Sequence, residues 1–551
     1  MATYEINGSL FADMVRGGAK NLRANAQVVN DLNVFPIPDG DTGDNMMLTM
    51  EGGSAALRGI ASTALSFIAE KFARGALLGA RGNSGVILSQ FFAGVAKGLS
   101  DVERADAAAM AKAFQSGVKQ AYGAVLTPTE GTILTVAREA TEYAVEHLSE
   151  STALEDFFSN ILIGMNESLK HTPELLPILK ESGVIDSGGA GLVYILEGMY
   201  KILRGEQVEE SASAEAPKAP EIDFSLFGAD SVMEFGYCTE CLLQLQNSKV
   251  DAESFPVSTI SDFLTTIGDS IVAVKSGTVV KIHVHTMTPG KVFEFCQQFG
   301  EFLTVKVENM TLQHSEVKAE ERTEEEKPQE HKPFGIVTVA AGTGIKETFL
   351  SLGANYVVEG GQTMNPSSED FLAAFDIVNA DTIYVLPNNG NIVLAARQAA
   401  ALYKKADIRV LESKTIGEGY AALTMLDFES GDADMIEENL RFAMEGVVTA
   451  QLTRSVRDSH LGGLDIAKND YIGFVGKEML ADAPTMREAT EMLLSKLDMT
   501  DREAMICIAG KDAAGADVET VRNWIQQHRP GVELFEIDGG QDVYPLILVL
   551  P

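Results

Sequence analysis

The sequence predicts a multidomain protein with a largely α-helical first domain, an α+β middle domain and an α/β C-terminal domain. Helical patterns broken by glycine- and proline-containing loops fill the first 200 or so residues. Short β-rich runs follow, and after them β-like runs alternate with helix-like ones, which is typical of a parallel sheet covered by helices. At 551 residues, the chain is long enough for several domains.

The domain boundaries follow from changes in composition. The first domain spans residues 1–204, and residues 205–222 form a linker of small, acidic and proline residues. The middle domain spans residues 223–312 and contains the β-rich runs CLLQLQ and VVKIHVHT. A second charged linker covers residues 313–333, and residues 334–551 form one α/β domain or two closely joined lobes, with the alternating runs in the first part. Within that last domain, SSEDF predicts a helix start at Ser367.

Composition restricts the function. The net charge of −36 would repel nucleic-acid phosphates and anionic membrane surfaces, so we expect no nucleic-acid partner. We find no signal peptide and no apolar stretch of membrane-spanning length, which predicts a cytoplasmic protein. The four cysteines are too few for a disulfide scaffold, so a cysteine with a special role is expected to bind metal.

The segment NVFPIPDGDTGDNM, residues 33–46, carries two nearby carboxylates at the start of a helical run. Asp39 and Asp41 could converge on one magnesium ion, which proteins usually hold through one or two carboxylates plus substrate phosphates. An EF-hand is excluded, because Gly43 and Met50 stand where that calcium loop needs ligands. From these residues alone, a surface turn with solvated carboxylates is favoured over a metal site.

Four ordered motifs change that balance. NVFPIPDGDTGDNM is followed by GARGNSGVILSQFF from Gly79, TPTEGTILTVAREA from Thr127 and GVIDSGGAGLVYILEGM from Gly183. Together they resemble the dihydroxyacetone-kinase L-type domain as it occurs in fatty acid kinases. The resemblance implies a barrel of antiparallel helices, in which clustered aspartates bind ADP or ATP through magnesium. The sequence contains no GxxxxGK[ST] P-loop, so this domain would have to bind ATP by other means.

The resemblance also implies roles for individual residues. Asp39 and Asp41 would hold magnesium and be catalytic. Asp44 departs from an expected threonine, and its role is open. The glycines of residues 79–85 suit close approach to phosphate oxygens, although tight packing between helices would also require them. The other residues expected at or near the nucleotide are Asn33, Thr42, Asn45, Met46, Gly82, Asn83, Ser84, Gly85, Thr132 and Asp186.

A second group of residues is suited to zinc. CTEC contains Cys238 and Cys241, and KIHVHT contains His283 and His285, which share one face if the segment is a strand. A redox pair and an ordinary exposed face are the alternatives. The resemblance to the middle domain of fatty acid kinases implies zinc held by Cys238, His283 and His285. Cys241 would be a fourth ligand or a buried thiol.

The strings GGQTMNPS and LPNNGN resemble the C-terminal region of the same kinases, which is related to DegV-like proteins that bind fatty acids. Asn365, Ser367, Asn388 and Asn389 could line a cleft at the ends of parallel strands. Capping of helices is the favoured alternative for each of them.

The resemblance implies a fatty acid kinase subunit that uses ATP, Mg²⁺ and Zn²⁺. Its substrate would be a fatty acid carried by a separate DegV-type binding protein, and its product an acyl phosphate for phospholipid synthesis. We also expect a homodimer, and a first domain that binds nucleotide independently of the C-terminal domain. The rival interpretations are a dihydroxyacetone-type small-molecule kinase and a non-catalytic nucleotide-binding regulator.

Overall fold

The protein is described by a computed structural model. The residues it describes are 3–32, 40–60, 62–208, 237–252, 254–276, 278–309, 330–362, 364–429, 431–461 and 463–551. They form two compact units. One unit combines the helical domain, residues 1–214, with the C-terminal domain, residues 328–551. The other is the middle domain, residues 215–327.

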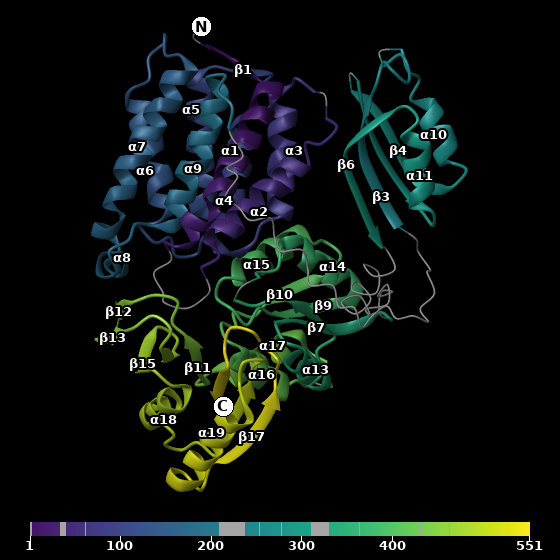
Figure 1. The fold of residues 1–551 in the computed structure, drawn as a ribbon. Coiled ribbons are helices and arrows are strands. Elements are labelled where there is room, and N and C mark those ends of the chain that lie inside the picture. Colours follow the sequence, from purple (N-terminus) through teal and green to yellow (C-terminus); the bar gives the residue numbers. More distant parts are fainter. Residues whose placement is uncertain are drawn as a thin grey trace. The chain divides into compact units, whose positions relative to one another are not determined.

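The first domain is almost entirely helical, as the sequence predicts. Its helices lie side by side, and successive long helices run in opposite directions (Figure 1). A two-residue pairing of β1 (Ile6–Asn7) with β2 (Arg104–Ala105) is antiparallel. The helices are α1 (Gly8–Asn30), α2 (Thr42–Ala55), α3 (Leu65–Leu78), α4 (Gly82–Gly98), α5 (Ala107–Gly123), α6 (Ile133–Glu146), α7 (Leu154–Leu175), α8 (Pro177–Ser182) and α9 (Ser187–Leu203).

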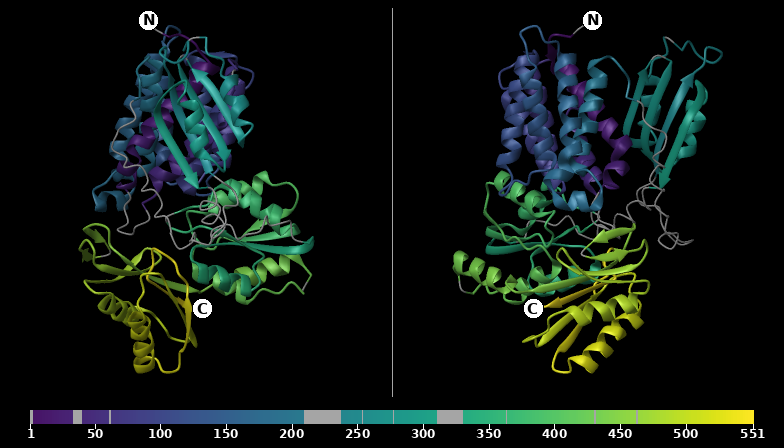
Figure 2. Two further views of the ribbon diagram at one scale, coloured as in Figure 1. Left: turned by 45° about the vertical axis from the view of Figure 1, so that its right-hand side comes forward. Right: turned by 90° about the vertical axis from the view of Figure 1, so that its left-hand side faces the viewer.

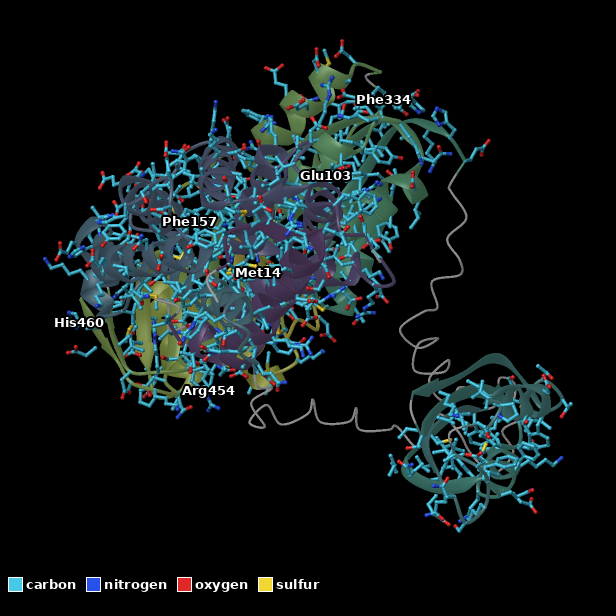
Figure 3. All side chains as sticks on the ribbon, turned by 90° about the horizontal axis from the view of Figure 1, so that it is seen from above. Met14, Glu103, Phe157, Phe334, Arg454 and His460 are labelled. Carbon is cyan, nitrogen blue, oxygen red and sulfur yellow. The ribbon has the colours of Figure 1, made fainter. Side chains whose placement is uncertain are left out.

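The helices enclose a single apolar core. Met14 of α1 and Phe157 of α7 are completely buried, and both lie among the helices in Figure 3. Phe114 makes edge-to-face contacts with Phe91, Phe157 and Phe158, with ring centroids 5.5, 5.8 and 5.9 Å away. Such pairs favour one arrangement of the rings beyond the area they bury, so they help to fix how α4, α5 and α7 pack.

The middle domain is α+β, as predicted. Its four strands form an antiparallel sheet in the order β4-β5-β3-β6, and two short helices accompany them. The elements are β3 (Tyr237–Leu245), α10 (Ser258–Leu264), β4 (Gly268–Ser276), β5 (Val279–Thr286), α11 (Pro289–Cys296) and β6 (Gly300–Asn309).

The C-terminal domain begins with the predicted parallel sheet, whose strand order is β10-β9-β7-β8. Val337 and Val339 of β7 pack with α14 and α15, while Ile336 and Ala340 pack with α13 and α16 on the opposite face. Figure 2 shows helices on both sides of this sheet. The elements are β7 (Lys332–Ala340), α13 (Thr343–Ser351), β8 (Tyr356–Glu359), α14 (Ser368–Val378), β9 (Ala380–Leu386), α15 (Val393–Leu402), β10 (Asp407–Val410) and α16 (Ile416–Thr424).

The predicted helix start at Ser367 is confirmed as a capping box. The Ser367 hydroxyl accepts from the Asp370 backbone, and the Asp370 carboxylate accepts from the Ser367 N–H at 2.7 Å. Asp replaces the more usual Glu at this position.

A second lobe follows, built on a six-stranded sheet with the order β15-β14-β11-β18-β16-β17. Within this sheet only β16 and β17 pair in parallel, and they flank the helix predicted between two strands in the tail of the chain; the other strand pairs are antiparallel. The elements are α17 (Ala433–Met444), β11 (Val448–Arg454), β12 (Ser459–Leu461), β13 (Leu464–Ile466), β14 (Tyr471–Val475), β15 (Glu478–Ala483), α18 (Met486–Lys496), β16 (Ala504–Ala509), α19 (Gly515–His528), β17 (Glu533–Asp538) and β18 (Leu546–Leu550).

Among the described residues, no helix has both the length and the apolar character needed to cross a membrane.

Glycines let α1 and α9 approach closely. A Cβ on Gly198 would overlap the carbonyl oxygen of Gly17 and would lie 2.8 Å from the Cα of Gly18. Real Cβ atoms do not come this close to backbone, so a larger residue would push the two helices apart.

Gly198→Ala should therefore destabilise the helical domain by about 1–3 kcal/mol. The thermal unfolding midpoint measures the change. Gly123→Ala is the matched control, because a Cβ at the end of α5 meets no atom within 4 Å and helix propensity favours alanine. Equal midpoints for Gly198→Ala and the control would contradict the close approach of α1 and α9.

Candidate active site

Four helices begin at one end of the helical domain. The Ser187 hydroxyl, at the start of α9, donates to the Thr42 hydroxyl at the start of α2, 3.3 Å away. Gly82, the first residue of α4, packs on Asn45 of α2. The Asp186 carboxylate accepts backbone hydrogen bonds from the starts of both α9 and α6. Helix N-termini present unpaired N–H groups and a partial positive charge, so their convergence favours an anion such as a phosphate.

The start of α2 is held against the end of α1 by one amide. The Oδ1 of Asn30 accepts from the Gly43 N–H at 2.7 Å, and its Nδ2 donates to Asp44 at 2.9 Å. Any side chain at position 43 would overlap the carbonyl oxygen of Ala26. Asp44, whose role the sequence leaves open, is therefore a partner of Asn30.

Asp41 occupies the N-cap position of α2, and its side chain does not cap that helix. Its Oδ2 instead accepts a hydrogen bond from the Nδ2 of Asn365 in the C-terminal domain.

Asn33 and Asp39 lie outside the described residues, so their predicted roles stay predictions. Met46 is completely buried against Gly191, so it packs α2 on α9.

The glycine loop packs against α2 in the way that close approach requires. Gly82 has a φ of +56°, and a Cβ there would lie 2.5 Å from Asn45 Nδ2 and 3.2 Å from Asn365 Nδ2. A Cβ on Gly85 would overlap the Thr49 hydroxyl. These contacts support the tight-packing interpretation of the loop, and its role at the phosphates stays a prediction.

Two other predicted residues lie in the first turn of α4. Ser84 is half-buried. Asn83 donates to the side chain of Asn391 at 3.3 Å, whereas its Oδ1 is buried without a hydrogen bond. A buried acceptor without a hydrogen-bond partner costs free energy.

Asp186 is the N-cap of α9. Its Oδ2 accepts from the Gly189 N–H at 2.6 Å, and its own N–H donates to the Thr172 hydroxyl at 3.1 Å. The carboxyl group lies between the starts of α6 and α9, and this burial raises its pKa to about 6, even though backbone hydrogen bonds from Gly189 and Ile133 oppose the rise.

Thr132 is the N-cap of α6, where its hydroxyl accepts from the Leu134 N–H at 3.4 Å and donates to the Thr129 carbonyl at 2.7 Å. The preceding turn is rigid. Glu130 accepts from Thr135 at 2.6 Å and from Arg138 at 3.1 Å, and the first of these bonds is the main cause of its lowered pKa.

The C-terminal domain contacts this end of the barrel. Arg81, just before α4, donates from its guanidinium to the Asn365 carbonyl at 2.8 Å, and its backbone forms a bridge with Ser367. Gln398 of α15 donates to the Leu77 carbonyl at 2.7 Å and accepts from Gln90 at 2.7 Å. The expectation of an independent first domain thus differs from the structure, in which loops from both domains meet at Asp41.

The four polar residues predicted in the C-terminal domain divide into different roles. Ser367 caps α14, as favoured. Asn388 and Asn389 line a cleft at the carboxyl ends of the parallel strands, together with Ala341, Gln362 and other residues. Asn388 is held there by donating to Val339 at 2.9 Å and accepting from Ser413 at 2.8 Å. Asn365 takes neither role, because it reaches Asp41.

The zinc prediction concerns side chains outside the described set. The backbone register pairs Cys238 with His285, and Glu240 with His283, on neighbouring strands β3 and β5. Among the described residues there is no group of three or more potential metal ligands. Cys241 is a buried thiol in the apolar core, and that burial raises its pKa to about 12. Strand alternation places position 238 on the opposite face, so Cys241 is not a fourth ligand.

Known proteins with similar sequences cover the whole chain. Protein YloV of Bacillus subtilis is 38% identical over 559 residues and spans 100% of both chains. An uncharacterized protein of Staphylococcus epidermidis is 38% identical over 555 residues and spans 98% of both. Three family models match in succession: the DAK2 domain at residues 36–201, the middle domain of FakA-like fatty acid kinase proteins at 234–317, and their C-terminal domain at 335–550. The chain belongs to the FakA-like fatty acid kinase family.

Parts of this FakA-like protein also resemble solved structures. The dihydroxyacetone kinase from C. freundii in complex with AMP-PNP and Mg²⁺ is 18% identical, with a TM-score of 0.29 over 35% of this chain and 34% of that chain. DegV, a fatty acid binding protein from Bacillus subtilis, is 12% identical, with a TM-score of 0.31 over 40% of this chain and 99% of that chain. The predicted succession of a DAK2-type helical domain, a middle domain and a C-terminal domain of the fatty acid kinase type is confirmed.

Sequence reasoning missed two contributors to this site in the FakA-like protein. Asn30 fixes the start of α2, and Asn365 contacts Asp41. Asn30 is the last residue of α1, and no sequence pattern pairs it with Gly43. The sequence indicates Asn365 only as a cleft or capping residue, because its separation of 324 residues from Asp41 leaves no sequence pattern that could pair them.

The raised pKa of Asp186 predicts a pH-dependent cost. A carboxyl whose folded pKa exceeds its unfolded value near 4 stabilises the fold fully below that value, and the stabilisation is lost as the pH rises to about 6. Asp186→Asn keeps an acceptor for Gly189 without ionising. In nucleotide-free protein, its stability relative to wild type should rise by about 2 kcal/mol between pH 4 and pH 7. Calorimetric unfolding midpoints across that range measure it, and a constant difference would contradict the burial of this carboxyl.

Proposed function

We propose that this chain is the nucleotide-binding subunit of a fatty acid kinase. It would transfer the γ-phosphate of ATP to the carboxylate of a fatty acid carried by a separate DegV-type binding protein. The product would be an acyl phosphate used for phospholipid synthesis. The convergence of the starts of α2, α4, α6 and α9 around Asp41 and Asp186 carries the proposal.

The described residues fit a magnesium nucleotide. Helix N-termini and the glycine backbone at Gly82 and Gly85 suit phosphate oxygens, and Asp41 supplies the hard oxygen ligand that magnesium prefers. The buried Oδ1 of Asn83 is an acceptor without a partner at the same place. Bound magnesium would neutralise the phosphate charge, and we expect Asp39 and Asp41 to hold it.

The chain's own residues would then hold the transferring phosphoryl group in place. A fatty acid carboxylate is already ionised near neutral pH, so phosphoryl transfer to it needs no general base. Fixed helix N-termini stabilise charge on the transferring phosphoryl group without reorganising during the reaction. The packing that fixes them, at Asn30, Gly43 and Gly82, is therefore part of the proposed catalytic design.

The rival functions differ in acceptor or in chemistry. A dihydroxyacetone-type kinase would transfer phosphate to a hydroxyl group, and a regulator would bind nucleotide without turnover. The middle and C-terminal family matches, which extend over 234–317 and 335–550, favour the fatty acid acceptor.

The deciding experiment measures ATP consumption by the purified chain with a DegV-type protein, fatty-acid-loaded or empty, and with dihydroxyacetone. Turnover only with the loaded partner supports the proposal, and turnover only with dihydroxyacetone would replace it.

Asp41→Asn tests the magnesium role directly. The substitution keeps the size of the side chain but removes a negative charge and a strong metal ligand, so turnover should fall by at least about 100-fold. Acyl-phosphate formation against magnesium concentration measures the loss, and circular dichroism checks folding. Asp39→Asn should behave in the same way.

Asp44→Asn is the matched control for the same loop. Asp44 is exposed and bonds to Asn30, so its replacement should leave turnover within about threefold. Near-wild-type turnover in both Asp39→Asn and Asp41→Asn would mean that this loop is a surface turn and not a magnesium site.

The zinc site of the middle domain is a further part of the proposal. Cys238 pairs with His285 across β3 and β5, and His283 lies two residues away on the same strand as His285. We expect about one zinc per chain, lost in the double variant His283→Ala with His285→Ala. Elemental analysis of the purified chain provides the measurement. Cys241→Ser should retain zinc, because Cys241 belongs to the apolar core. Absence of zinc from the wild-type protein would contradict the proposed zinc site.

A further inference from the structure

A loop of the C-terminal domain reaches the nucleotide end of the helical domain. It connects β8 to α14 and carries Asn365 and Pro366. Arg81 lies beside it, with a guanidinium hydrogen bond to the Asn365 carbonyl at 2.8 Å. The Ser368 N–H donates to the carbonyl of Ala80 at 3.3 Å. The backbone just before α4 is thus bound to the backbone just before α14.

The side chain of Asn365 is only 1% exposed, and it lies against the starts of both α2 and α4. Its Nδ2 donates to Oδ2 of Asp41. The reverse orientation of the amide would bring its oxygen against the carboxylate, so electrostatics fixes which way it faces. Its Oδ1 is buried without a hydrogen-bond partner in the described structure. Burying a polar atom without a hydrogen bond costs free energy, so a residue that only fills space would not be expected to have such an atom.

Backbone hydrogen bonds hold the described residues on either side of Asn365. The Gly361 N–H donates to the Met364 carbonyl at 3.0 Å, and the Gly360 N–H donates to the Ala340 carbonyl at 3.1 Å. Pro366 restricts the backbone of Asn365 to extended conformations, and the capping box of α14 follows immediately. An amide on this support can hold a carboxylate in one orientation.

We propose that Asn365 is a positioning residue for the nucleotide site, and that the C-terminal domain thereby completes a site otherwise built by the helical domain. The inference rests on the proposed function, because it assigns Asp41 to magnesium. Asn365 acts through Asp41: its N–H fixes the orientation of the carboxylate before the metal nucleotide arrives. Partners that orient a metal ligand typically change metal affinity by about 10–100-fold when they are removed.

Domain docking offers a competing explanation, in which Asn365 merely fastens two domains together. Gln398 separates the two explanations. It is 7% exposed and hydrogen-bonds to Leu77, Ser89, Gln90 and Ser368, so it fastens the same interface. None of its partners belongs to the Asp41 loop or to the segment 79–85.

The test compares Asn365→Ala, Asn365→Leu and Gln398→Ala in the full chain. Calorimetry measures the affinity for AMP-PNP with magnesium, and steady-state kinetics with a loaded DegV-type partner separates kcat from KM. We expect both Asn365 variants to weaken nucleotide affinity about 10–100-fold and to need correspondingly more magnesium for half-maximal binding. Leucine fills the volume without donating, so it should fail as alanine does. Gln398→Ala should lower the unfolding midpoint and keep the nucleotide affinity within about twofold.

The outcomes are distinct. If Asn365→Ala and Asn365→Leu bind the nucleotide within twofold of wild type, the inference is wrong while the proposed function stands. If Gln398→Ala loses affinity as strongly as the Asn365 variants, docking is the explanation and Asn365 has no special role. Wild-type protein that fails to bind the magnesium nucleotide would overturn the proposed function itself. Binding without acyl transfer would leave the inference in place and refute only the acceptor.

Discussion

The close packing of α4 against α2 is the contact on which the rest of the site depends. Because Gly82 and Gly85 have no side chains, the first turn of α4 can lie against Asn45 and Thr49. This packing brings two helix N-termini together, and the hydrogen bonds of Ser187 and Asp186 add α9 and α6. The starts of four helices, each with a partial positive charge, then share one region, and the Gly43, Ile133 and Gly189 N–H groups are hydrogen-bonded there to side chains.

Asp186 lies within that positive region, between the starts of α6 and α9. Isolated burial disfavours an ionised carboxylate, and this raises the pKa of Asp186. Hydrogen bonds from Gly189 and Ile133 offset part of the cost. In the proposed site, helix starts that suit phosphate lie beside the Asp41 carboxylate, which could hold a metal ion, and a metal nucleotide needs both kinds of group.

Much of the fold could be predicted from sequence, whereas contacts between residues far apart in the chain could not. The capping box at Ser367, the helical first domain and the parallel strands of the C-terminal domain follow from short-range patterns, and the structure has them. The sequence allowed for two joined lobes, but the antiparallel pairing in the second lobe was missed because isolated β-rich runs do not reveal their pairing partners. The contact between Asp41 and Asn365 was missed because it joins residues 324 positions apart, and only the folded chain brings them together.

That separation has a consequence for how the protein is made. Chains grow from the N-terminus, so the helical domain can fold as soon as its helices emerge, mostly through contacts between neighbouring segments. The loop that meets Asp41 is synthesised much later, after the whole middle domain. A nascent or truncated chain that ends before residue 365 would hold a folded helical domain with an unfinished site, so the surroundings of Asp41 would be complete only after about two thirds of the chain had been made.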